Sequence, residues 1–167
     1  MTVRRILGWP DKRLRTASLP VETVTDDIRT IWTDMIDVME AMPGVGLAAN
    51  QIGVMLRLAV VDASEVRGQA VRMANPQVLH ASARPNIHEE ASPCLPGISA
   101  KIERPRAVTV QFLNVHGEVE ERDFVGLWAT SVQHQIDHLN GRMYFDRLSP
   151  IKRQMLLKRA EKAARRG

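Results

Sequence analysis

The hydrophobic pattern of the chain changes its period along the sequence, and this change fixes the order in which helices and strands can follow one another. From Ile28 to Met42 apolar residues recur every three or four positions, which predicts an amphipathic helix. Thr25 stands where an N-cap is needed, and Pro43-Gly44 ends the pattern. The N-terminal quarter is therefore expected to form a helix that buries one face.

The middle of the chain is instead rich in strand patterns. Alternating or β-branched segments predict strands or extended segments at 57–62, 70–80, 107–113 and 118–124. The last two are separated only by residues 114–117, which predicts a β-hairpin. Helical spacing returns at 127–139, ends at Asn140-Gly141, and is followed by a final helix from Ile151.

A single domain over residues 1–167 is expected, because 167 residues that are 44% hydrophobic can close one substantial core. No apolar run approaches the roughly 20 residues of a membrane span. The first ten residues lack the pattern of a signal peptide, so a cytoplasmic location is expected. Cys94 is the single cysteine and cannot form an internal disulfide, which fits a reducing compartment.

The net charge of +4 is carried by the C-terminal segment 151–167, which holds seven basic side chains and one acidic side chain. Such a basic helical tail is either a solvated helix face or a surface for phosphates or an acidic partner. Aromatic residues do not interleave with the basic ones, so a platform for single-stranded nucleic acid is not supported.

Two histidines lie four positions apart on the helix expected at 127–139. His134 and His138 project from one face, so they can reach one metal ion, or they can be two hydrogen-bonded histidines of a core. Cys94, taken alone, is a small buried residue, a reactive thiol or a ligand. Together, a thiolate and two imidazoles form a three-ligand set that leaves a position for water, as in hydrolytic metal sites.

Three segments, taken in order, resemble the motifs of peptide deformylases. They are GVGLAANQ at 44–51, Cys94-Leu95, and HQIDHLNG at 134–141. Flanking pieces at 73–76 and 104–112, the second expected to be one strand, extend the resemblance over nearly the whole chain.

The resemblance implies an α+β fold, in which antiparallel or mixed β-strands surround a central helix that carries metal ligands. It also implies an activity, the removal of the formyl group from the N-terminal methionine of nascent proteins. Cys94, His134 and His138 would hold one divalent ion, with ferrous iron as the expected native metal and zinc, nickel or cobalt as replacements.

The resemblance further implies the contacts with the substrate. Gln51, through its side-chain amide, and Leu95, through its backbone N–H, would stabilise the oxyanion. The backbone of Val45 and Gly46 would pair with an extended peptide. The methionine side chain would occupy a pocket lined by Val45, Leu127, Ser131 and His134.

The most consequential departure from the family pattern is Gln135, which stands where the motif His-Glu-x-x-His has its glutamate. A neutral amide can hydrogen-bond a water but cannot usefully accept its proton, and general acid or base catalysis is worth about 10² to 10⁴ in rate. We therefore expect weak or undetectable turnover. Asp137 flanks the ligand direction on the opposite side, so a structural hydrogen-bonding role is expected for it.

A second departure precedes the cysteine. Ser92-Pro93 replace the usual Glu-Gly, and Pro96 replaces a serine after Leu95. Glu89 and Glu90 are displaced upstream, where either acting as a substitute base is a minor alternative. The path of this loop is therefore less constrained by the resemblance than the ligands are.

Two functions remain. The chain is a metal-dependent deformylase, or a related amide hydrolase, of low activity; alternatively it is a catalytically silent metal protein that binds formylated or extended peptide N-termini. Gln135 favours the second function, whereas Gln51 and the complete ligand set favour the first. A zinc protease is disfavoured, because it needs the same missing glutamate and leaves Cys94 unexplained. A ribosomal contact through residues 151–167 is a further hypothesis.

Overall fold

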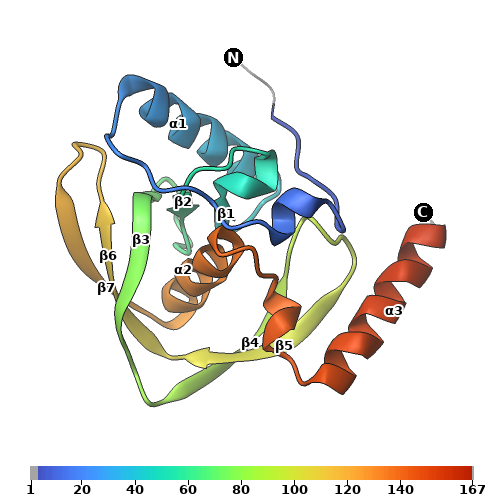
Figure 1. The fold of residues 1–167 in the computed structure, drawn as a ribbon. Coiled ribbons are helices and arrows are strands. Elements are labelled where there is room, and N and C mark those ends of the chain that lie inside the picture. Colours follow the sequence, from blue (N-terminus) through green and yellow to red (C-terminus); the bar gives the residue numbers. More distant parts are fainter. Residues whose placement is uncertain (1–3, 167) are drawn as a thin grey trace.

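The computed structural model describes residues 4–166, which form an α+β fold (Figure 1). The α-helices are α1 (Asp26–Ala41), α2 (Gly126–Leu139) and α3 (Pro150–Arg166). Short 3-10 helices are η1 (Lys12–Arg15), η2 (Ala49–Ile52) and η3 (Tyr144–Arg147). The strands are β1 (Gly46–Ala48), β2 (Leu58–Val61), β3 (Val71–Ala81), β4 (Pro85–Ala91), β5 (Ser99–Pro105), β6 (Ala107–Leu113) and β7 (Val119–Val125).

The strands form two separate antiparallel sheets. The larger has the order β1-β2-β3-β6-β7, and the smaller is the hairpin β4-β5. Strand β3 is long and irregular, because register shifts interrupt its pairing with β6 at two places. The first of these shifts includes Asn75, whose positive φ of 52° is uncommon for a residue with a side chain.

Helix α2 occupies the centre of the molecule, where it contacts both sheets (Figure 1). Its apolar residues Ala129, Val132 and Leu139 pack in a buried cluster with side chains of the larger sheet. Helix α1 covers β1 and β2 and buries Trp32, which donates a hydrogen bond from Nε1 to the Met73 carbonyl at 3.1 Å. Helix α2 therefore packs against strands of both sheets.

The C-terminal helix α3 lies at the edge of the molecule (Figure 1). It buries only Leu156 and Ala160, in a cluster with Tyr144, Phe145 and residues of the N-terminal segment. Most of its basic side chains are exposed. No helix within residues 4–166 combines the length and apolar character needed to cross a bilayer.

Most of the expected elements are confirmed. The helices at the start, centre and end of the chain, the strands at 57–62, 70–80 and 107–113, and the hairpin β6-β7 all form within a few residues of their expected bounds. The single strand expected at 104–112 was wrong, because β5 ends at Pro105 and β6 begins at Ala107 in the other sheet. Proline lacks an N–H and fixes φ, which breaks the strand there.

The cap of α1 offers a direct stability test. Thr25 Oγ1 accepts a hydrogen bond from the Ile28 N–H at 3.3 Å. We expect Thr25→Ala to lower the free energy of unfolding by about 1 kcal/mol, because a helix N–H loses its acceptor. Urea unfolding measures the loss, and Thr25→Ser, which keeps the oxygen, is the control. Equal losses in both variants would contradict the capping role.

Candidate functional site

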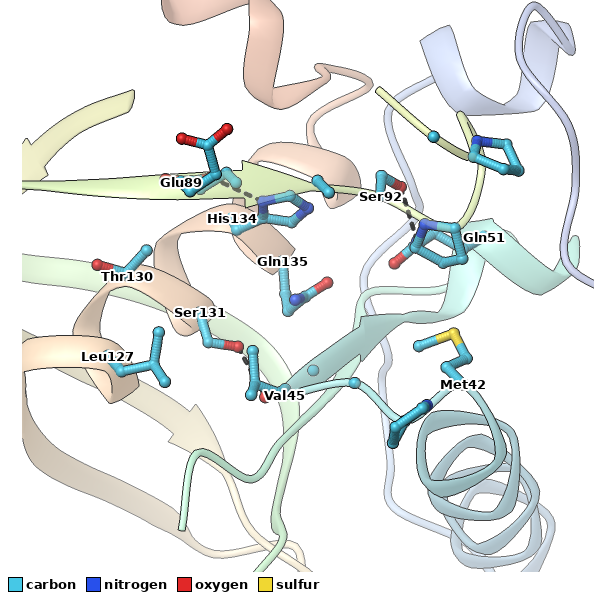
Figure 2. A pocket seen from close by; sticks show the side chains of 18 residues that line it. Met42, Val45, Gln51, Glu89, Ser92, Leu127, Thr130, Ser131, His134 and Gln135 are labelled. Carbon is cyan, nitrogen blue, oxygen red and sulfur yellow. Dashed lines mark hydrogen bonds and ion pairs between the residues drawn. The ribbon is translucent and has the colours of Figure 1, made fainter. Parts of the chain in front are cut away.

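A cavity of about 450 Å³ lies between helix α2, the segment that joins α1 to β1, and the segment that joins β4 to β5 (Figure 2). It collects many of the residues singled out in the sequence. Those that line it are Val45, Gly46, Gln51, Leu127, Ser131, His134 and Gln135. Cys94, Leu95 and His138 do not line it and are buried.

The two histidines face each other one turn apart on α2. Their Nε2 atoms lie 3.2 Å apart, which is hydrogen-bond distance, so without an ion the two rings form a hydrogen-bonded pair. His134 Nδ1 lies 2.8 Å from Glu90 Oε1, and since a carboxylate only accepts hydrogen bonds, this nitrogen carries the hydrogen and leaves Nε2 with a free lone pair. Burial lowers the pKa of His138 well below its ordinary value, and the charge of Arg104 acts in the same direction, so this ring is neutral.

The two rings are prepared for an ion, because metals bind neutral imidazole nitrogens. Two such nitrogens around one tetrahedral ion are separated by about 3.3 Å when each bond is about 2.0–2.1 Å. Nδ1 of His138 is buried and has no hydrogen-bond partner among the described residues. The ring is therefore not held in place by a hydrogen bond through Nδ1. The rings therefore fit a divalent metal.

Cys94 is buried next to Gln51. Its Sγ accepts a hydrogen bond from Gln51 Nε2 at 3.6 Å, and burial raises the pKa of its thiol above the ordinary 9.0. Within residues 4–166 no three His, Cys, Asp or Glu side chains are grouped as a metal cage, so Cys94 Sγ must approach the histidines to complete the expected set. The three-ligand assignment stays a prediction.

Gln51 is fixed at the back of the cavity by both ends of its amide. Its Oε1 accepts the Ala48 N–H at 2.9 Å, which turns Nε2 toward Ser92 Oγ at 3.4 Å and toward Cys94. The N–H of Leu95, by contrast, donates to the Ser92 carbonyl at 2.9 Å within a turn. Only one of the two expected oxyanion donors therefore reaches the cavity.

Glycine at position 46 allows β1 to pass very close to side chains of α2. A Cβ at this position would lie 2.5 Å from both Gln135 Nε2 and Ser131 Oγ, closer than such atoms can approach. Ser131 Oγ in turn donates to the Val45 carbonyl at 2.8 Å. Gln135 is itself buried, and its Oε1 has no partner among residues 4–166. Figure 2 shows Gln135 between His134 and Ser131.

A buried ion-pair network supports the His134 ring from behind. Arg104, on β5, is 1% exposed and donates to both oxygens of Glu90 at 2.7 and 2.9 Å. It also donates to Asp137 at 2.9 Å, which accepts from Arg147 as well. Asp137 therefore has a structural hydrogen-bonding role, as expected. The sequence did not reveal the part played by Glu90 and Arg104.

Both carboxyl groups of this network stay ionised. Burial by itself would raise the pKa of Glu90, but hydrogen bonds from His134 and Arg104 outweigh it and lower the pKa below the ordinary 4.5. For Asp137, hydrogen bonds and charges from Arg147 and Arg104 likewise overcome burial and lower the pKa below 3.8. Glu90 is therefore occupied as a hydrogen-bond acceptor for His134 and is not free to act as a base.

Comparison with known proteins decides the family. The family profile described as polypeptide deformylase matches residues 3–154. This chain belongs to the peptide deformylase family. Peptide deformylases of Rhodopseudomonas palustris (strain BisB18) and Afipia carboxidovorans are 41% and 42% identical to it, over 100% and 99% of this chain and 98% of each relative.

Solved peptide deformylases share the fold. The crystal structure of the enzyme from Legionella pneumophila superposes with a TM-score of 0.90 at 39% identity, covering 98% of this chain and 96% of that chain. The enzyme from Ehrlichia chaffeensis in complex with actinonin gives a TM-score of 0.89 at 34% identity, covering 98% of each chain. Nearly the whole chain therefore shares the deformylase fold.

The buried arginine of this deformylase fold provides a stability prediction. Arg104→Met removes the cation from two buried carboxylates, of which Glu90 would be left with the His134 ring alone. We expect a loss of about 3–5 kcal/mol in the free energy of unfolding, because an uncompensated buried charge is expensive. Chemical denaturation measures it. Arg106→Met, at an exposed position two residues away, is the matched control and should change the free energy of unfolding by less than about 0.5 kcal/mol. Similar losses of stability in both variants would refute the role of the ion-pair network.

Proposed function

We propose that this chain holds one divalent metal ion on His134, His138 and Cys94 and receives the formylated N-terminus of a methionyl peptide in the cavity beside it. The observation that carries this proposal is the 3.2 Å approach of the two Nε2 atoms, one of whose rings lines the cavity. The family to which the chain belongs supports the choice of substrate. Ferrous iron is the expected native ion, with zinc, nickel and cobalt as replacements.

When bound, the metal would lower the pKa of a water and polarise the formyl carbonyl. The residues of the chain supply the remaining functions. Gln51 Nε2 donates toward the carbonyl oxygen, where negative charge develops. Glu90 keeps the hydrogen of His134 on Nδ1, so Nε2 remains available as a ligand.

The rim of the cavity fits a peptide that begins with methionine. Val45 and Leu127 are partly exposed apolar side chains, 36% and 43%, which an unbranched apolar side chain can cover. The backbone at Val45 and Gly46 lies at the end of strand β1, beside the cavity, where an extended peptide can pair with it. Val45, Gly46, Leu127 and Ser131 thus form the proposed substrate-binding wall.

Gln135 sets the rate of the proposed reaction. It lies at the position where a base would take a proton from the attacking water and pass it to the leaving amine, and an amide does neither. Turnover is therefore slow.

The Gln135 side chain also favours a second candidate function, a catalytically silent binder of formylated N-termini. Its Oε1 is buried and has no partner among residues 4–166, so it can accept a hydrogen bond from the N–H of a formamide that is not cleaved.

Exchange of Gln135 for glutamate tests whether the missing proton acceptor limits deformylation. We expect Gln135→Glu to raise kcat for deformylation of a formyl-Met peptide by about 10² to 10⁴, because it restores the proton acceptor. Kinetics and elemental analysis on the same metal-loaded samples measure rate and metal together. Gln154→Glu, the same exchange at an exposed position on α3, should change nothing. Equally high kcat values in the unchanged protein and in Gln135→Glu would contradict the proposed role of Gln135.

We also propose that the basic face of α3 contacts ribosomal RNA or an acidic surface near the exit of nascent chains. Exposed basic residues gather on this helix, which is joined to the fold by only two buried side chains. Reversal of three exposed charges (Lys158→Glu, Lys162→Glu and Arg166→Glu) should weaken co-sedimentation with ribosomes at least roughly tenfold at low salt. Leu156 and Ala160 are left intact so that the fold is kept. Unchanged co-sedimentation would remove this contact.

A further inference from the structure

The segment before Cys94 takes a path that changes which groups can stabilise negative charge. Ser92 and Leu95 close a turn in which the Leu95 N–H donates to the Ser92 carbonyl at 2.9 Å. Pro93 occupies the second position of this turn, where its fixed φ is favourable. The backbone donor implied by the family resemblance is therefore already used, and Leu95 does not line the cavity.

The Ser92 side chain stands at the wall of the cavity. It is 4% exposed, and Figure 2 shows it beside Gln51, joined by a dashed line. Its Oγ accepts hydrogen bonds from Gln51 Nε2 at 3.4 Å and from the Cys94 N–H at 3.3 Å. Both partners are donors, so the hydroxyl hydrogen is not used in either bond.

The hydroxyl lies within reach of the Cys94 thiol, whose pKa its hydrogen bond lowers against the effect of burial, and Ser92 also borders the cavity. Rotation about the Cβ–Oγ bond can turn the same hydrogen from Cys94 Sγ to a ligand oxygen in the cavity. Ser92 Oγ stands beside Gln51 Nε2, whose own bonds to Ser92 Oγ and Cys94 Sγ are long, at 3.4 and 3.6 Å, so a formyl oxygen can compete for its hydrogens. Paired donors of this kind are the usual arrangement for a carbonyl oxygen that gains negative charge.

We propose that Ser92 is a catalytic residue, whose hydroxyl donates a hydrogen bond to the formyl oxygen of the substrate together with Gln51, in place of the Leu95 N–H. This inference rests on the proposed function, since it names a donor for the same substrate. Ser92 forms no covalent bond and keeps its proton throughout. The Ser92-Pro93 replacement before Cys94 thus exchanges a backbone donor for a side-chain donor.

The first test measures binding and needs no turnover. In the native metal-loaded protein, calorimetry gives the Kd of an N-formyl-methionyl tripeptide and of the same tripeptide without the formyl group. We expect Ser92→Ala to reduce the preference for the formylated peptide by about 3- to 10-fold, the effect of one lost hydrogen bond. The Kd of the unformylated peptide and the metal content should not change.

The second test measures catalysis in the Gln135→Glu protein. Adding Ser92→Ala should lower kcat by about 10²-fold with little change in KM, because the donor acts most strongly as charge develops on the oxygen. Ser82→Ala is the matched control in both tests. Ser82 Oγ accepts the N–H of Arg84 at 3.1 Å, as Ser92 Oγ accepts the N–H of Cys94, and Ser82 does not line this cavity.

The outcomes separate this inference from the proposed function. If Gln135→Glu is active and Ser92→Ala lowers neither kcat nor the formyl preference, the Ser92 assignment alone is overturned. Loss of metal in Ser92→Ala, or an equal effect of Ser82→Ala, shows a structural role and also overturns it. If the native protein has no preference for the formylated peptide, both this inference and the proposed function fail.

Discussion

The ion pairs of Arg104 hold the site together, since one buried guanidinium joins three parts of the fold. It binds Glu90 on β4 and Asp137 on α2 from its own place on β5. The small sheet is thereby attached to the central helix at the level of the histidines. Because a buried cation and its carboxylates tolerate little displacement, the distance between the small sheet and α2 is fixed by the same contacts that orient His134.

Much of this architecture could be predicted from the sequence, and the failures have physical causes. The periodicities of α1 and α2 and the hairpin β6-β7 were visible because their buried positions are apolar. Strands β4 and β5 were missed because their inward-facing residues include Glu90 and Arg104, which do not look like core positions. Charges that neutralise each other across two strands leave no hydrophobic alternation to detect.

The site was predictable to the same extent. Residues on regular elements, such as His134, His138 and Ser131, lie where helical spacing places them. The loop before Cys94 was not predictable, because the bond from the Leu95 N–H to the Ser92 carbonyl depends on the turn that Pro93 favours. Glu90 looked like a surplus acid in the sequence, and only strand pairing shows that it serves His134 and Arg104.

The crowding around Gly46 bears on how such a protein can change its chemistry over time. Gly46, Ser131 and Gln135 fill one another's space, so a larger side chain at any one of the three positions would displace its neighbours. Glutamate and glutamine, however, differ by one terminal atom and occupy almost the same volume. Position 135 can therefore exchange an amide for a carboxyl group with little change of packing, although a buried carboxylate would need a new hydrogen-bond donor.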